Sequence, residues 1–217
     1  MKQLHNRNTY IVVFPPGAGG NHLANLILSA IQPNNTVVDT LRDYYARINE
    51  YKTAHAPSLT ATGIRLSNCL VEDPAKLQKY ILRNYTSVIA GHIEEVDFIL
   101  SHVQSISNVH IVLIHLDNIS PNGKNGMDFL LDRNLKNSYN IPGMQDNLLP
   151  WVYKEQQLSK IFGSLNNSII NIPINDLFAN DVSPILYRLT KESNNKLIFD
   201  YDLCQYLHSQ WYNELIR

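Results

Sequence analysis

The amino-acid sequence predicts a single three-layer α/β domain over residues 1–217, with a central parallel sheet covered by helices on both faces. Three observations lead to this fold class. Short apolar runs rich in β-branched residues recur along the chain, segments with helical spacing separate them, and a glycine-rich loop follows the first run. With 217 residues and 44% hydrophobic content, the chain can bury one sizeable core. No repeat or linker marks a domain boundary.

Four of the apolar runs are predicted to be strands. Each run is continuous rather than alternating, which is typical of strands buried on both faces of a parallel sheet. Parallel neighbours need crossover connections, so helices are expected between them. The first run ends at two prolines, and we expect it to lie at the centre of the sheet. The predicted strands are residues 10–14, 87–92, 109–115 and 168–172.

The segments between these runs carry apolar residues three and four positions apart, the spacing of a helix that buries one face. Leu23, Leu26 and Ile27 share such a face, and their helix is expected to end before Pro33. Residues 36–39 are interpreted as a second, short strand because they contain adjacent valines. Further helices are predicted over residues 74–83, 94–100, 126–136 and 149–161, and over much of the chain after residue 173.

Charge and composition restrict the kinds of partner. The net charge is −1, and charged residues make up 17% of the chain, against about a quarter in an average soluble protein. Broad electrostatic binding of nucleic acid or membrane is therefore not expected. No apolar run approaches the roughly 20 residues that span a bilayer, and the first residues lack the apolar stretch of a signal peptide. We expect a cytoplasmic protein with no nucleic-acid or membrane partner.

The loop at residues 15–22 joins the first predicted strand to the first helix. Its glycines permit positive φ and remove Cβ atoms that would keep a phosphate from the backbone amides, and the helix N-terminus adds unpaired N–H groups. The loop therefore predicts an anion site; the alternative is a tight turn whose glycines only let the helix pack on the strand. Gly19→Val should block a phosphate and spare the fold if φ at Gly19 is negative. The predicted ligand-binding residues of the loop are Pro16, Gly17, Ala18, Gly19, Gly20, Asn21 and His22.

Two common phosphate-binding motifs are absent from this loop. A Walker A motif needs a lysine and a hydroxyl residue where the chain has Asn21 and His22, which disfavours ordinary ATP or GTP hydrolysis. In the dinucleotide motif Gly-x-Gly-x-x-Gly, the third glycine would fall on His22. Cys69 and Cys204 lack the paired spacing of a zinc site, and no metal is expected.

The loop does resemble the phosphosulfate loop of the sulfotransferase family, Pro-Lys/Arg-Ser/Ala-Gly-Thr/Ser-Thr/Ser-Trp-Leu. Members of this family have a P-loop NTPase-like fold and transfer sulfate from 3′-phosphoadenosine 5′-phosphosulfate (PAPS). Gly17 stands at the family's Lys/Arg, and Gly20 and Asn21 stand at its two hydroxyl residues. The matching positions are Pro16, Ala18, Gly19 and Leu23.

Three later segments resemble the same family, in the same order along the chain. Residues 90–93 are similar to a Lys-Thr-His-Leu segment whose histidine is the acceptor base, which implies a catalytic His92. At the end of the third strand, His115 stands at the family's 3′-phosphate arginine, and Ser120 lies close to the position of its serine. Residues 170–178 look like the segment that precedes the family's late helices.

The resemblance implies transfer of sulfate from PAPS to a hydroxyl or amine acceptor that His92 activates. The implied ligands are PAPS, or its product 3′-phosphoadenosine 5′-phosphate (PAP), and an unidentified acceptor. Because Gly17 lacks the family's positive charge, Lys124, Arg65, Arg133 or another basic residue must supply it, or the activity is lost. Two alternatives remain: a non-catalytic nucleotide- or anion-binding protein, and a degenerate nucleotide or small-molecule kinase. A kinase needs Mg²⁺ ligands, and the loop has no Ser or Thr to provide one.

Overall fold

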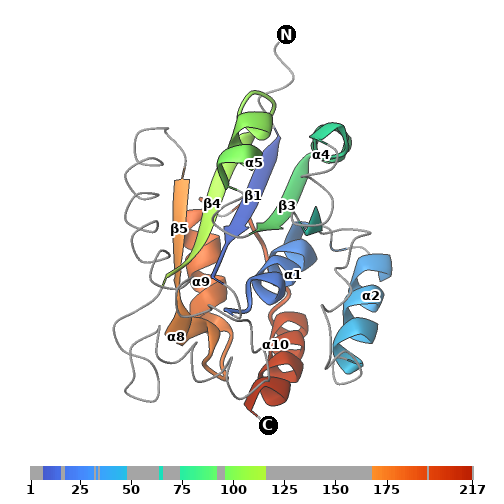
Figure 1. The fold of residues 1–217 in the computed structure, drawn as a ribbon. Helices are drawn as coiled ribbons and strands as arrows, with labels where there is room; N and C mark the ends of the chain where they lie inside the picture. Colours follow the sequence, from blue (N-terminus) through green and yellow to red (C-terminus); the bar gives the residue numbers. More distant parts are fainter. Residues whose placement is uncertain are drawn as a thin grey trace, which may run out of the picture.

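A parallel sheet flanked by helices organises the chain in the computed structural model, as Figure 1 shows. The described residues are 7–15, 18–31, 33, 35–47, 64–65, 74–91, 96–115, 168–194 and 196–216. The strand order is β2-β3-β1-β4-β5, and every neighbouring pair is parallel. The strands are β1 (Asn8–Val13), β2 (Ile64–Arg65), β3 (Thr86–Gly91), β4 (Asn108–His115) and β5 (Ser168–Pro173).

The four strands expected from the sequence are confirmed, with bounds that differ by one or two residues. β1 lies between β3 and β4, so the expectation that the first strand is central is also confirmed. Its last residue, Val13, pairs with Gly91 on one side and Leu113 on the other. Tyr10 to Val13 are fully buried, which explains why the run is apolar without alternation. The two-residue β2, on the β3 edge, was not predicted.

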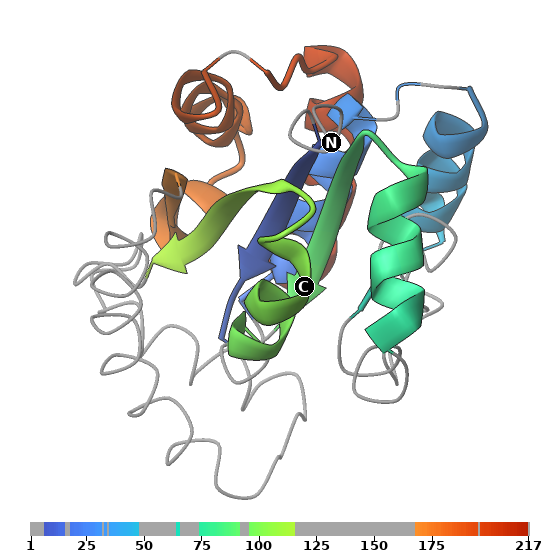
Figure 2. The same cartoon turned by 90° about the horizontal axis from the view of Figure 1, so that it is seen from above.

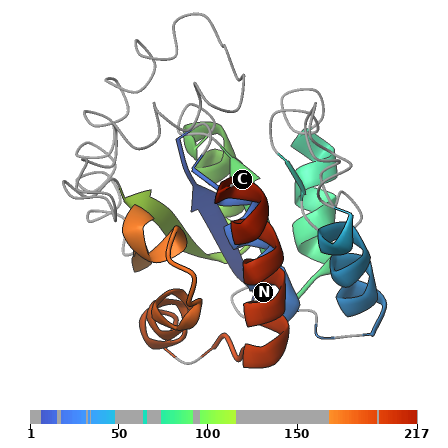
Figure 3. The same ribbon diagram turned by 90° about the horizontal axis from the view of Figure 1, so that it is seen from below.

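Helices cover both faces of the sheet. The helices of the described residues are α1 (Gly20–Ile31), α2 (Asn35–Ala46), α4 (Pro74–Arg83), α5 (Val96–Val103), α8 (Ile174–Leu177), α9 (Ser183–Glu192) and α10 (Tyr201–Ile216). Figure 2 shows α4 and α5, which contact each other, on one side of the sheet, and α1 and α10 on the other. Figure 3, from below, shows α10 in front of α1 and β1, with α2 beside it. The three-layer arrangement is therefore confirmed.

The interpretation of residues 36–39 as a strand is wrong, because they lie within α2. Val37, Leu41 and Tyr45 are the buried residues of this helix, and their four-residue spacing places them on one face. The adjacent valines favour a strand locally, but burial of this face decides the structure.

The remaining expectations about helices divide into two groups. α1 ends at Ile31, before Pro33, and α4 covers residues 74–83, both as predicted. α5 overlaps the helix predicted at residues 94–100. The helices predicted at 126–136 and 149–161 lie outside the described residues. Among the helices of the described part, none has the length and apolar character that crossing a bilayer requires.

Candidate functional site

The turn between β1 and α1 has the strand–turn–helix geometry that the sequence predicts. The amide of Ala18 donates a 3.1 Å hydrogen bond to the carbonyl oxygen of Pro15, and α1 begins two residues later, at Gly20. Gly19 has a φ of 79°, in the left-handed region that favours glycine. The chain thus reverses from strand to helix through a backbone conformation that needs glycine.

Trp211 covers this turn at Gly19. A Cβ atom on Gly19 would lie 2.5 and 2.9 Å from the Cζ2 and Cη2 atoms of Trp211, and 3.4 Å from Cδ2 of Leu177. Trp211 is a buried residue of α10, and Leu177 ends α8. Position 19 therefore needs glycine for its φ and for this contact. Because φ is positive, the condition for a fold-sparing Gly19→Val substitution is not met, and that substitution cannot separate phosphate binding from folding.

Gly20 is packed equally closely, against the ring of Phe14. A Cβ atom on Gly20 would overlap the Cγ, Cδ1 and Cε1 atoms of that ring. Both described glycines of the loop are thus explained by side-chain packing, as the tight-turn alternative expects. The support for an anion site at this turn therefore comes from the backbone amides and the dipole of α1. The number of glycines in the loop does not support such a site.

The first turn of α1 offers positively polarised N–H groups to an anion. α1 has 12 residues, and its first turn contains no acidic residue, so no carboxylate there neutralises the positive end of the helix dipole. The first N–H groups of an α-helix have no partner within the helix. Helix N-termini of this kind bind phosphate and sulfate in proteins. Asn21, in this turn, is partly exposed.

His22, the next residue of α1, is buried in a hydrogen-bonded network. Its Nδ1 atom lies 2.6 Å from the hydroxyl oxygen of Tyr45 on α2, and its Nε2 atom lies 2.9 Å from Nδ1 of His208 on α10. Nε2 of His208 lies 2.7 Å from the carbonyl oxygen of Ala179. The Asn25 amide donates a 3.2 Å hydrogen bond to the Tyr45 hydroxyl. These five residues are called the His22 network below.

The carbonyl group at one end of the His22 network assigns the direction of each hydrogen bond. A carbonyl oxygen only accepts, so Nε2–H of His208 donates to Ala179, and the other ring nitrogen of neutral His208 is an acceptor. Nε2–H of His22 therefore donates to His208, and Nδ1 of His22 accepts from the Tyr45 hydroxyl. Both histidines are neutral in this assignment.

Burial favours the same neutral state. Burial lowers the pKa of His22 well below its ordinary value, and the nearby His208 lowers it further. The pKa of His208 is also lowered by burial, against smaller opposing effects of the Ala179 carbonyl and Asp181. Burial raises the pKa of the Tyr45 hydroxyl well above its ordinary value, so this hydroxyl keeps its proton.

The His22 side chain is thus fully engaged within the protein. Besides its two hydrogen bonds, its ring stacks on the indole of Trp211, with centroids 4.2 Å apart and planes 9° apart. The sequence predicts His22 as a phosphate ligand, but a phosphate contact would have to replace one of its hydrogen bonds. We therefore assign the described His22 side chain a structural role, joining α1 to α2 and α10.

The other predicted site residues are only partly described. His115 is the last residue of β4, is half-buried and pairs with Pro173, so it lies at the carboxyl end of a strand next to β1. Ala18 is buried in the turn. The predicted site residues that lie outside the described part of the chain are Pro16, Gly17, His92, Ser120 and Lys124.

The partners of His22 were not found from the sequence. Tyr45 and His208 are separated from His22 by 23 and 186 residues, and no local pattern links them. Among the late aromatic residues, Trp211 is buried, whereas Tyr201 and Tyr206 are 48% and 40% exposed.

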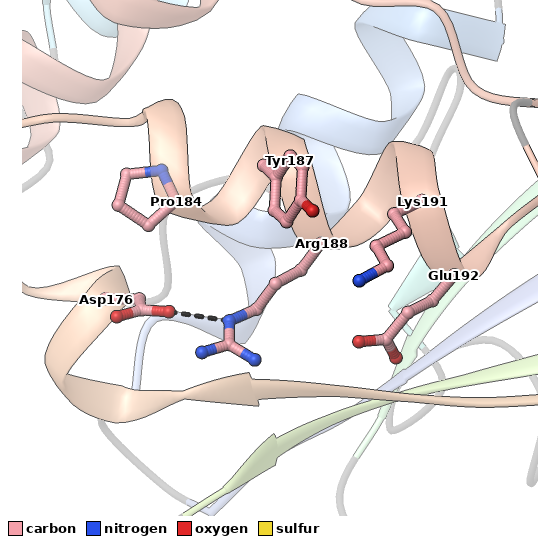
Figure 4. A pocket seen from close by; sticks show the side chains of 6 residues that line it. All are labelled: Asp176, Pro184, Tyr187, Arg188, Lys191 and Glu192. Carbon is pink, nitrogen blue, oxygen red and sulfur yellow. Dashed lines mark hydrogen bonds and ion pairs between the residues drawn. The ribbon is translucent and has the colours of Figure 1, made fainter.

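A separate surface pocket of about 260 Å³ lies along α9. Figure 4 shows Asp176 and Arg188 pointing toward one another, and their 2.8 Å contact is an ion pair. Nζ of Lys191 lies 5.5 Å from the ring centroid of Tyr187. The pocket brings together two cations and two carboxylates, so its charges balance. Its lining residues are Asp176, Pro184, Tyr187, Arg188, Lys191 and Glu192.

No protein-family model matches this sequence, and no curated protein matches it. Within the described ranges, no three His, Cys, Asp or Glu side chains come together as a metal site. The α/β fold is established, and kinship with sulfotransferases stays a prediction.

The contact between Gly20 and Phe14 can be tested by a double-mutant cycle. Gly20→Ala should lower the free energy of unfolding by about 1–3 kcal/mol, because the added methyl group overpacks the turn. In a Phe14→Ala background the same substitution should cost less than about 0.5 kcal/mol, since alanine favours a helix over glycine. Urea unfolding of the four proteins measures both values. Equal costs in the two backgrounds would contradict the contact.

Proposed function

We propose that this protein is a sulfotransferase-like nucleotide-binding protein with a P-loop-like site. In this proposal, the phosphosulfate end of PAPS, or the 5′-phosphate of PAP, binds the amides of Gly19, Gly20 and the first turn of α1. One observation carries the proposal. A glycine turn at the carboxyl end of the central parallel strand leads directly into a helix whose first turn has no acid.

The strand order supports a ligand site at the same end of the sheet. From β1 the chain crosses to β2 on one side, whereas from β4 it continues to β5 on the other side. Ligands of open α/β sheets bind at the carboxyl ends of strands where the direction of crossing reverses. Here that point lies between β1 and β4. His115 ends β4, the neighbour of β1, and in this proposal it lies beside the bound ligand.

The positive charge that Gly17 lacks has one candidate source on a described strand. Arg65 is the last residue of β2 and pairs with Ala90, one residue before the end of β3. Its backbone therefore lies at the carboxyl end of the sheet. Lys124 and Arg133 are the other candidates from the sequence, and both lie outside the described residues.

His92 is the proposed base for the acceptor. It directly follows Gly91, the last residue of β3, which pairs with Val13 of β1. An imidazole with an ordinary pKa near 6.5 can accept a proton from a hydroxyl or amine near neutral pH. In-line sulfate transfer then needs positioning and stabilisation of the leaving phosphate, which the amides of α1 would supply.

A non-catalytic binding protein is the second candidate, and packing at the turn favours it. Gly19 and Gly20 are required by Trp211 and Phe14, and Gly17 stands where the family has its positive residue. An anion site can persist under these conditions without the charge that transfer needs. The two candidates share the ligand site and differ in turnover.

Adding a negative charge to the first turn of α1 tests the ligand site. Asn21→Asp should keep or slightly raise stability, because an acid near a helix N-terminus contributes about 0.3–1 kcal/mol. It should weaken PAP binding by about 5- to 150-fold, since like charges about 5 Å apart cost roughly 1 to 3 kcal/mol. Isothermal titration calorimetry measures the affinity of the wild type and of the Asn21→Asp variant for PAP.

Asn35→Asp is the matched control for this experiment. It places the same charge at the start of α2, where Asn35 is exposed and outside the turn. PAP affinity should be unchanged in this variant. Equal affinity of the Asn21→Asp variant and the wild type, or no binding of PAP, ATP or sulfate to the wild type, would contradict the proposed site.

A thermal-shift comparison separates the donor classes. PAP at 100 times its Kd should stabilise the protein by about 2.7 kcal/mol, or roughly 5–10 °C in Tm for a chain of this size. ATP with Mg²⁺ at the same concentration should give a smaller shift. A larger, Mg²⁺-dependent shift with ATP would instead support the kinase alternative.

The role of His92 is tested by turnover. His92→Ala should leave PAP affinity essentially unchanged and lower sulfate transfer by about 10²–10⁴-fold, the usual contribution of a positioned base. His102→Ala, on α5, is the control and should retain activity. Full activity of the His92→Ala variant would remove His92 from the mechanism. PAP binding with no turnover of any acceptor by the wild type would favour the binding protein.

A further inference from the structure

We propose that the His22 network is an acid-sensitive clasp that holds α10 against α1 and α2 and releases it when both histidines are protonated. The inference does not depend on the proposed function. It rests on the position of α10, on the direction of the hydrogen bonds and on the surroundings of the two rings.

The position of α10 allows it to move away from α1 and α2. Its most extensive contacts are with α1 and α2 rather than with a strand. Figure 3 shows it as the outermost element on its side of the sheet, in front of α1. The His22–His208 hydrogen bond joins α10 to α1, and the Tyr45 bond extends the chain to α2. Apolar burial of Leu203, Leu207 and Trp211 also holds the helix. Weaker or peripheral hydrogen bonds add to it: Gln205 accepts from the Val182 amide and donates to the Asn180 carbonyl, the Tyr201 hydroxyl donates to Asp181, and the Ser29 hydroxyl oxygen on α1 lies 3.6 Å from Sγ of Cys204.

Adding protons to His22 and His208 disrupts the hydrogen bonds of the network in two steps. One added proton turns Nδ1 of His22 into a donor to the Tyr45 oxygen, either because His22 carries the charge or because charged His208 forces neutral His22 into its other tautomer. The Tyr45 hydroxyl must then direct its own proton elsewhere, and a full charge is left in the core. A second proton makes all four ring nitrogens donors. His22 and His208 then oppose N–H to N–H across a separation of 2.9 Å, and their hydrogen bond cannot exist.

The surroundings offer little compensation for positive charge. The titratable groups next to the two rings are Tyr45 on α2, Tyr212 on α10, and Asp181 between α8 and α9. Tyr44 and Cys204 act on Tyr45. Burial raises the pKa of the Tyr45 hydroxyl and of the Cys204 thiol, so neither supplies a negative charge near pH 7. Asp181 is the only carboxylate of the described residues that acts on the pair, and it is fully exposed.

The sign of the pH effect follows from the lowered pKa of both histidines in the closed state. When α10 is released, the rings regain an ordinary pKa near 6.5 and bind protons that the closed state excludes. The clasp is therefore fully effective above about pH 6.5 and weakens as the pH falls below that value. Each proton taken up on opening raises the opening constant by about tenfold per pH unit.

Hydrogen exchange measured by mass spectrometry from pH 7 to pH 5 tests the clasp in the whole chain. After correction for intrinsic exchange rates, protection of residues 201–216 should fall by between about 10- and 100-fold per pH unit below pH 6.5, reflecting one to two protons. β1 and β4 should stay protected over this range. Equal losses in α10 and the strands, or no loss in α10, would overturn the proposal.

Two variants test how many protons are taken up when α10 is released. His208→Gln keeps an amide that can donate to Ala179 and removes one titrating ring. The fold loss of α10 protection per pH unit, which is the slope compared here, should therefore be about ten times smaller than in the wild type. His102→Gln makes the same change on α5, on the other side of the sheet, and should leave the slope unchanged. An unaltered slope in the His208→Gln variant would overturn the proposal.

The ring protons can be read directly in the wild type, whether or not the His208→Gln variant folds. Nitrogen-15 NMR at pH 7 should show His22 and His208 as neutral rings protonated at Nε2. A charged ring, or a proton on Nδ1 of either histidine, would contradict the assigned hydrogen bonds and with them the clasp.

Discussion

Close packing around two glycines, neither of which has room for a Cβ atom, fixes the first helix of this protein against its central strand. Gly19 lies under the indole of Trp211, and Gly20 lies under the ring of Phe14. Because Trp211 belongs to α10 and also stacks on His22, the same contacts connect β1, α1 and α10. The direction in which α1 leaves the sheet, and therefore the direction of its first N–H groups, depends on this packing.

The packing also limits how a ligand can approach. The faces of Gly19 and Gly20 that would carry side chains are occupied by aromatic rings, so an anion has to meet the backbone amides from another side. His22, the nearest titratable side chain on α1, is engaged in its own network. Besides the candidates outside the described residues, a cation or base beside a bound anion would come from the carboxyl ends of neighbouring strands. Arg65 and His115 hold such positions among the described residues.

Much of the sheet could be predicted because buried parallel strands leave a strong local pattern. The continuous apolar runs around Tyr10, Val88, Val112 and Ile170 all form strands, and the first is central. At residues 36–39 the local preference of two valines was overruled by burial of Val37 on a helical face.

The candidate site was predictable only in outline. A glycine-rich loop between a strand and a helix predicts a turn, and the turn is present. The sequence could not supply the positive φ of Gly19 or the aromatic rings that cover it, because Trp211 is remote in sequence. For the same reason, His22 resembled a ligand, whereas His208 and Tyr45 engage both of its ring nitrogens.

The central claim is that the amides at the start of α1 bind a phosphate or sulfate group. Amide chemical-shift mapping by NMR during a titration with PAP tests it most directly. If the claim is correct, the largest saturable shifts will be those of the Gly19, Gly20 and Asn21 amides, because hydrogen bonding to an anion deshields the N–H protons it contacts. Saturable shifts confined to other parts of the chain, or no shifts at millimolar PAP, would contradict it.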